Sequence, residues 1–62
     1  MTDRLLPIED VMAAAGVKRT KLYALVASGE FPQPVKIGTA SRWSEAEVSA
    51  WIAERKEQRA AA

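Results

Sequence analysis

The sequence predicts a small, mainly α-helical domain that carries one β-hairpin. Three observations indicate this fold class. Apolar residues recur at helical spacing in three segments, the first two segments each end at a glycine, and a strand-like alternation precedes the third. A length of 62 residues is typical of one domain. We expect residues 1–62 to form it, ordered over about residues 4–56, with a frayed C-terminal tail.

The composition limits the chemistry that the chain can perform. It has no cysteine and no histidine, which excludes disulfides, thiolate metal sites and the commonest general base. No apolar run approaches the roughly 20 residues of a membrane span, and the first residues do not resemble a signal peptide. We therefore expect a cytoplasmic, nucleoid-associated protein that is not an enzyme and has no cofactor, metal or small-molecule ligand.

The first two predicted helices form a helix-turn-helix pattern. One is expected over residues 8–15, where Pro7 suits the first turn and Gly16 the end. Its apolar face consists of Ile8, Val11, Met12 and Ala15. The next begins within about three residues and ends at Gly29, with a buried stripe of Leu22, Leu25 and Val26.

A two-stranded wing is predicted after the second helix. Val35–Ile37 and Ser41–Trp43 alternate around a turn at Gly38–Ala40, and the two prolines before them favour extended chain. An isolated hairpin is marginal in water, so the wing must pack on the helices, with Trp43 and Ile37 as its expected anchors.

The third helix has the clearest local signal in the chain. Ser44 and Glu47 form a capping box, in which each side chain bonds the other residue's backbone N–H. The helix is expected from about Glu45 into the fifties, with an apolar face of Val48, Trp51 and Ile52. The fold class is thus a winged helix-turn-helix of three helices and a two-stranded wing.

Positive charge is concentrated in the middle of the chain. Residues 16–43 carry five cations against one carboxylate, whereas the segments on either side are mildly acidic. Four residues, Lys18, Arg19, Thr20 and Lys21, fall at the start of the second helix. Cations at this positive end of a helix do not stabilise it, so an anionic partner would explain them. The alternative is a solvated basic turn.

Other polar and aromatic residues extend this prediction. Lys36 and Arg42 flank the hairpin turn and could reach phosphates or a minor groove, although Lys36 could equally protect a strand edge. Tyr23 is expected to place its ring in the core and leave its hydroxyl free for a phosphate. Trp43 and Trp51 are interpreted as core residues, not as stacking platforms.

Several segments of the chain resemble the AlpA family of prophage-type regulators and excisionase-like proteins, which have a MerR-like winged helix. The resemblance covers residues 4–53 and is carried by Val11–Val17, Thr20–Tyr23, the G-E-F-P-x-P-V-K-I-G stretch at Gly29–Gly38, Arg42–Trp43 and Glu47–Ile52. It implies binding to double-stranded DNA, a recognition segment at Lys18, Arg19, Thr20, Lys21 and Tyr23, and a wing from Lys36 to Arg42 that includes Thr39 and Ser41.

One departure from the family concerns the start of the second helix, where Lys18 replaces the usual small N-cap residue. Either Thr20 caps the helix in a shifted register, or the helix start tightens on DNA. The leading hypothesis is a sequence-specific transcriptional regulator with paired or repeated sites and possible DNA-dependent self-association. The alternatives are an architectural excisionase that bends DNA, a protein-interaction module, and a binder of RNA or single strands.

Overall fold

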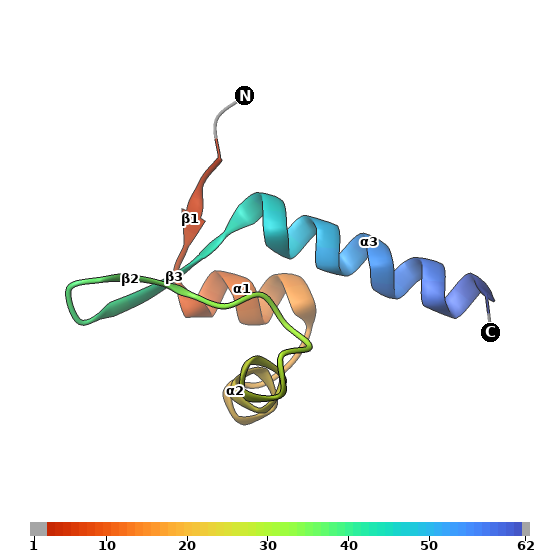
Figure 1. Ribbon diagram of the computed structural model, residues 1–62, viewed down its shortest axis with the longest axis horizontal. Helices are drawn as coiled ribbons and strands as arrows, with labels where there is room; N and C mark the ends of the chain where they lie inside the picture. The colour runs from red at the N-terminus through yellow and green to blue at the C-terminus, as the bar shows by residue number, and fades with distance from the viewer. Residues whose placement is uncertain (1–2, 62) are drawn as a thin grey trace.

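The structure, a computed structural model, describes residues 3–61. Figure 1 shows three helices around one small sheet, with the hairpin and α3 extending to opposite sides. In chain order the elements are β1 (Leu5–Leu6), α1 (Ile8–Ala15), α2 (Arg19–Ser28), β2 (Val35–Ile37), β3 (Ala40–Ser44) and α3 (Glu45–Ala61). The predicted fold class, mainly helical with a β wing, is confirmed.

Glycines end the first two helices in the way that the sequence predicts. Gly16 has φ 71° and Gly29 has φ 82°, a left-handed conformation that side chains rarely adopt. The Gly16 N–H donates to the Met12 carbonyl at 2.8 Å, and the Gly29 N–H donates to that of Val26 at 3.1 Å. Both glycines therefore bond carbonyls that the last helical turn leaves free.

The wing belongs to a three-stranded antiparallel sheet in the order β1-β3-β2. The hairpin pairs β2 with β3, as predicted, while the two-residue strand β1 was not predicted. It pairs Leu5 with Ser44 and Leu6 with Trp43. Since β3 is therefore central, the base of the hairpin is held by backbone pairing on both sides.

Trp43 anchors the sheet on the helices, whereas Ile37 does not. The Trp43 side chain is 0% exposed, and its Nε1 donates to the Pro32 carbonyl at 3.0 Å. Ile37 is 54% exposed, so its predicted anchoring role is wrong. The register explains the difference. Ile37 pairs with Ala40 and therefore lies on the same sheet face as Ala40. Trp43 is three residues from Ala40 on β3, so it lies on the opposite face.

The core lies where α1, α2, β3 and α3 meet. Its buried members are Leu6, Val11, Leu22, Leu25, Phe31, Trp43 and Val48. Trp51 packs at the margin, edge-to-face on Phe31 with 4.8 Å between ring centroids. Its Nε1 donates to the Glu30 carbonyl at 2.6 Å. Two tryptophans thus fix the Glu30–Pro32 segment, one from the sheet and one from α3.

The start of α3 is capped from two directions. The Ser44 hydroxyl accepts the Glu47 N–H at 3.2 Å, which confirms the first half of the predicted capping box. Among the hydrogen bonds of residues 3–61, the Glu47 side chain does not return the contact. Instead the Asp3 carboxylate accepts from the Ser44 hydroxyl and, at 3.0 Å, from the Ala46 N–H. These bonds hold the pKa of Asp3 below its ordinary value.

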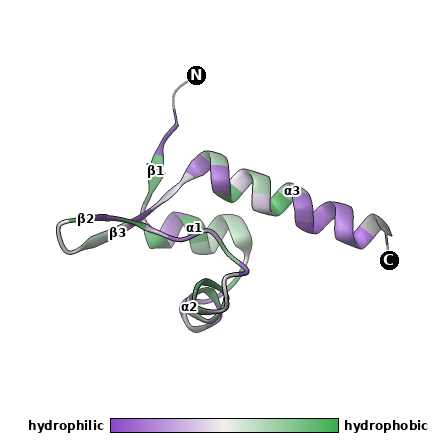
Figure 2. Cartoon of the chain, viewed as in Figure 1, coloured by the Kyte–Doolittle hydropathy of each residue, from purple (hydrophilic) through white to green (hydrophobic). Residues whose placement is uncertain are grey.

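The last turns of α3 are mostly hydrophilic, as Figure 2 shows. The helix continues to Ala61, beyond the predicted limit of order near residue 56. Fraying of this segment stays a prediction, based on its polar composition.

Candidate nucleic-acid interface

The N-terminus of α2 is open and basic. Lys18 is the N-cap, in an extended conformation (φ −85°, ψ 167°), and no side chain caps the helix. The helix begins at Arg19, so the shifted register with a Thr20 cap does not occur. The cluster Lys18, Arg19, Thr20 and Lys21 is exposed throughout. First-turn N–H groups without a side-chain cap lie beside three cations, an arrangement that attracts anions.

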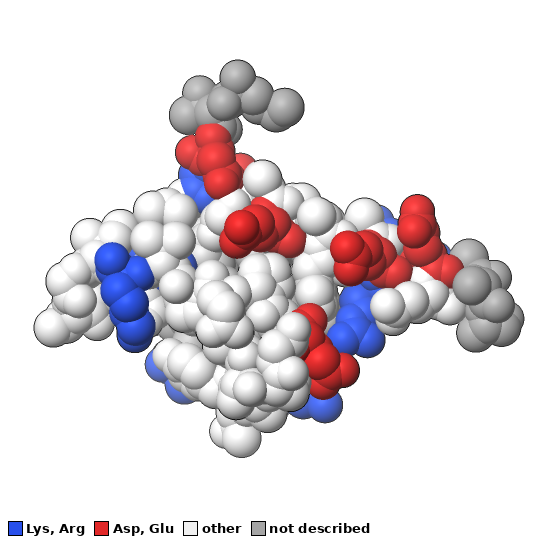
Figure 3. Space-filling model, in the orientation of Figure 1, with Lys and Arg blue, Asp and Glu red and all other residues white. Residues whose placement is uncertain are grey.

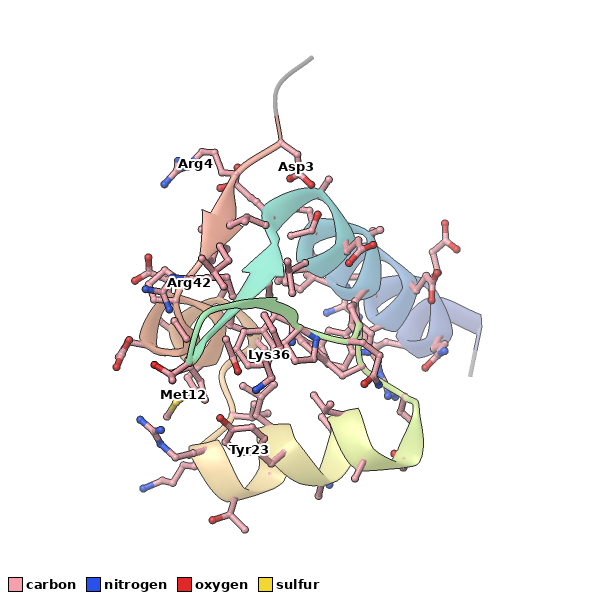
Figure 4. All side chains as sticks on the ribbon, turned by 60° about the vertical axis from the view of Figure 1, so that its left-hand side comes forward. Asp3, Arg4, Met12, Tyr23, Lys36 and Arg42 are labelled. Atoms are coloured by element: carbon pink, nitrogen blue, oxygen red, sulfur yellow. The ribbon has the colours of Figure 1, made fainter. Side chains whose placement is uncertain are left out.

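Lys36 and Ser41 lie together on the inner face of the hairpin. They are cross-strand partners, and the Lys36 Nζ donates to the Ser41 Oγ at 2.7 Å. Ser41 and Trp43 are two residues apart on β3, so this face is continuous with the buried one. In Figure 4, Lys36 projects from the hairpin toward α2, on the side where Met12 and Tyr23 also lie.

Tyr23 is an exposed residue of α2, not a core residue. Its side chain is 44% exposed, so the expectation that the ring joins the core is wrong. The buried stripe of the helix is formed by Leu22 and Leu25, and position 23 falls about 100° away from Leu22 around the axis. Tyr23 therefore presents its ring as well as its hydroxyl beside the basic helix start.

The structure separates Arg42 from Lys36. Arg42 pairs with Val35 on the outer face of the hairpin, and its Nη1 donates to the Ser41 carbonyl at 3.1 Å. Thr39 lies in the exposed turn between the strands, next to Gly38 at φ 61°. The predicted wing residues thus occupy three places: Lys36 and Ser41 inside, Thr39 at the tip and Arg42 outside.

Figure 3 shows how charge is distributed over the elements. Basic side chains lie on the hairpin and around α2, and acidic side chains lie near the N-terminal strand and along α3, where further basic side chains lie beside them. The first turn of α3 carries Glu45 and Glu47, which suit the positive end of that helix. The first turn of α2 thus carries cations, whereas the first turn of α3 carries carboxylates.

A comparison with known protein families identifies the family to which this chain belongs. Residues 4–56 match the family described as "Prophage CP4-57 regulatory protein (AlpA)". The chain belongs to this family. The AlpA proteins are prophage regulators of a DNA-binding type. The resemblance drawn from the sequence is thereby confirmed.

A relative of this AlpA-family chain is the "Uncharacterized protein ORF88" of Enterobacteria phage P4. The two are 39% identical over 54 residues, which are 86% of this chain and 61% of the relative. The chain thus spans less than two thirds of the relative's length. No solved structure matches this chain.

Arg4 is a cation beside the start of α3 that the sequence did not assign to the interface. It directly precedes β1, and its Nη1 lies 3.7 Å from the Glu45 Oε2. This ion pair is weak because the two side chains are 70% and 43% exposed. In Figure 4, Arg4 extends to the same side of the molecule as Arg42. Only the pairing of β1 with β3 reveals this position, and pairing between distant segments leaves no local pattern.

Membrane-spanning helices and acidic metal-binding clusters are absent from the part of the chain that the structure describes. None of its helices is long and apolar enough to cross a membrane. Within residues 3–61, no three acidic side chains come together in a way that could hold a metal ion.

Proposed function

We propose that this chain is a sequence-specific regulator that binds double-stranded DNA with the start of α2 in the major groove. The observation that carries the proposal is the exposed, uncapped N-terminus of α2 with Lys18, Arg19 and Lys21 around it. Recognition helices of helix-turn-helix proteins contact base edges with their N-terminal residues. Membership of a prophage regulatory family supports the same conclusion.

Arg19 is the residue we propose for base reading. It occupies the first helical position and is exposed, so its guanidinium is free to enter a groove. An arginine can donate two hydrogen bonds to O6 and N7 of guanine, which is the commonest specific contact in the major groove. Lys21 would contact a phosphate, Lys18 and Thr20 would contact phosphates or neighbouring bases, and the Tyr23 hydroxyl would donate to a phosphate.

The inner face and tip of the hairpin provide the second contact. Lys36 projects toward the α2 side of the molecule, as Figure 4 shows, and Ser41 lies beside it. Together with Thr39 at the turn, they would meet the backbone or the adjacent minor groove. On DNA, the Lys36 Nζ would exchange its bond to Ser41 for a charge-assisted bond to a phosphate oxygen.

Charge-matched substitutions test this assignment. The probe is a labelled duplex from the region upstream of the chain's own gene, with binding followed by fluorescence anisotropy. Arg19→Ala, Lys21→Ala and Lys36→Ala each remove one cation from the proposed surface. Lys56→Ala removes one exposed cation from α3 and serves as the matched control.

The expected results separate base reading from phosphate contact. Arg19→Ala should weaken binding by roughly tenfold or more and reduce the preference over a scrambled duplex, because a bidentate base contact contributes about 1–3 kcal/mol of discrimination. Lys21→Ala and Lys36→Ala should weaken binding to both duplexes alike. An equal effect of Lys56→Ala would refute the assignment. Equal affinity of the unsubstituted protein for both duplexes would favour an excisionase-like architectural role.

A further inference from the structure

The outer face of the sheet carries three exposed apolar side chains. Leu5 pairs with Ser44, Val35 with Arg42 and Ile37 with Ala40, and these three β3 positions alternate along one face of the strand. Leu5, Val35 and Ile37 are 45%, 44% and 54% exposed. They are three of the four large apolar side chains exposed in the described chain, so this exposure is concentrated and not scattered.

An acidic groove lies elsewhere on the molecule, between the segment that follows α2 and the side of α3. It is open to solvent and has a volume of about 680 Å³. Apolar surface comes from Pro32, Ala50 and Trp51, while Glu30, Glu47 and Glu54 contribute three carboxylates. No cation is among the residues that line it. The carboxylates disfavour a phosphate backbone in this groove, and the nearby Arg55 guanidinium lies over the Trp51 ring, 4.9 Å from its centroid.

We propose that the groove receives the outer sheet face of a second copy of this chain. At the β2 end of that face, Arg42 would lie against the groove carboxylates, whereas the Asp3 carboxylate lies at the β1 end, where it accepts from the Ser44 hydroxyl. Val35 and Ile37 would cover the exposed parts of Trp51 and Pro32. The complementarity is thus both apolar and electrostatic, and a single chain carries both halves of it.

Symmetric contacts between two copies fit these residues less well. Joining two outer faces would bring the Arg42 side chains toward each other, and pairing two β2 edges would place Lys36 opposite or beside its counterpart. Like charges in such positions destabilise sheet contacts. The contact between face and groove avoids both problems and leaves the basic start of α2 uncovered.

A contact between two different surfaces leaves one of each free on every pair, so copies can be added in a row. We expect each contact to be weak, because both surfaces are small parts of a 62-residue domain. DNA that bound several copies side by side would raise their effective concentration and strengthen the row. This consequence rests on the proposed function, whereas the contact itself does not.

Two variants, each with one surface altered, test the contact without DNA. Val35→Ser combined with Ile37→Ser alters the sheet face and keeps the groove, and Glu54→Arg alters the groove and keeps the face. Tyr23→Ser is the matched control, because it removes an exposed apolar side chain outside both surfaces. Far-UV circular dichroism verifies that each variant is folded, and sedimentation equilibrium in low salt measures association into the high micromolar range.

The unsubstituted protein and the Tyr23→Ser control should show an average mass that rises with concentration and passes beyond the dimer. Each surface variant alone should remain monomeric. An equimolar mixture of the two should reach a dimer and stop, since it retains one functional contact. Loss of association in the sheet variant but not in Glu54→Arg would indicate face-to-face pairing and overturn the proposal. A monomer at all concentrations, or a mixture that stays monomeric, would also overturn it.

These readings are independent of the proposed function. Loss of DNA binding in the anisotropy experiment would leave the sedimentation results unchanged. Conversely, the absence of self-association would leave the effects of Arg19→Ala on DNA affinity unchanged.

Discussion

Replacing Trp43 by phenylalanine should remove a large part of the stability of the domain. The indole is 0% exposed, and its Nε1 donates to the Pro32 carbonyl at 3.0 Å. The lost hydrogen bond accounts for about 0.5–1.5 kcal/mol. The space left by the smaller ring adds a cavity term, and we expect a total of about 2–3 kcal/mol. A domain of this size has an unfolding free energy of roughly 3–9 kcal/mol.

Urea denaturation followed by far-UV circular dichroism measures this effect. This signal reports helix content and does not depend on which tryptophan is present. With a denaturant dependence of about 1 kcal/mol per molar urea, the midpoint should fall by about 2–3 M. Ile37→Ser is the control on the same hairpin, and at 54% exposure it should change the stability by no more than about 0.5 kcal/mol. Equal midpoints for the two variants at low protein concentration would refute the assignment of Trp43 as the anchor.

Three other substitutions test the ends of the helices. Asp3→Ala should lower the thermal midpoint. Because the pKa of Asp3 is lowered in the folded protein, its contribution to stability is complete above the ordinary aspartate pKa and is lost as the pH falls through the lowered value. The thermal midpoints of the variant and the unsubstituted protein should therefore converge in acid and differ most near neutral pH. Lys18→Ser should stabilise the protein by about 0.5–2 kcal/mol in denaturation, since it supplies the missing N-cap of α2, while weakening DNA binding; a loss of stability would contradict the observed register. Gly29→Ala should cost about 1–2 kcal/mol from its φ of 82° alone, because an added Cβ would meet no atom within 4 Å, and an unchanged midpoint would contradict the left-handed geometry.

Local rules were sufficient to predict most of the elements. Gly16 and Gly29 define the ends of α1 and α2 because a positive φ is strained for other residues. The alternation on both sides of Gly38 predicts the hairpin, and Ser44 predicts the start of α3. Each of these signals lies within a few residues of the feature that it determines.

The features that were missed depend on distant pairing. Asp3 and Ser44 are 41 positions apart, so nothing near either residue indicates that a carboxylate would contact the start of α3. Strand β1 has two residues, too few to show an alternation.

The sequence predicts which residues belong to the candidate interface, but not the face of the hairpin or helix on which each of them lies. The basic start of α2 follows from sequence order alone. The separation of Lys36 from Arg42 requires the register of β2 and β3, because a shift by one residue would exchange the two faces. Tyr23 was misplaced because the sequence does not show how wide the buried stripe of α2 is.

The most direct test of the central claim is the salt dependence of DNA affinity, measured on the upstream duplex and on a scrambled one. If Lys18, Arg19, Lys21 and Lys36 contact phosphates and the groove, the slope of log K against log salt should approach about −3 to −4 per copy, with tighter binding to the upstream duplex. A slope near zero, or the absence of binding at low salt, would contradict the account and favour a protein-interaction module.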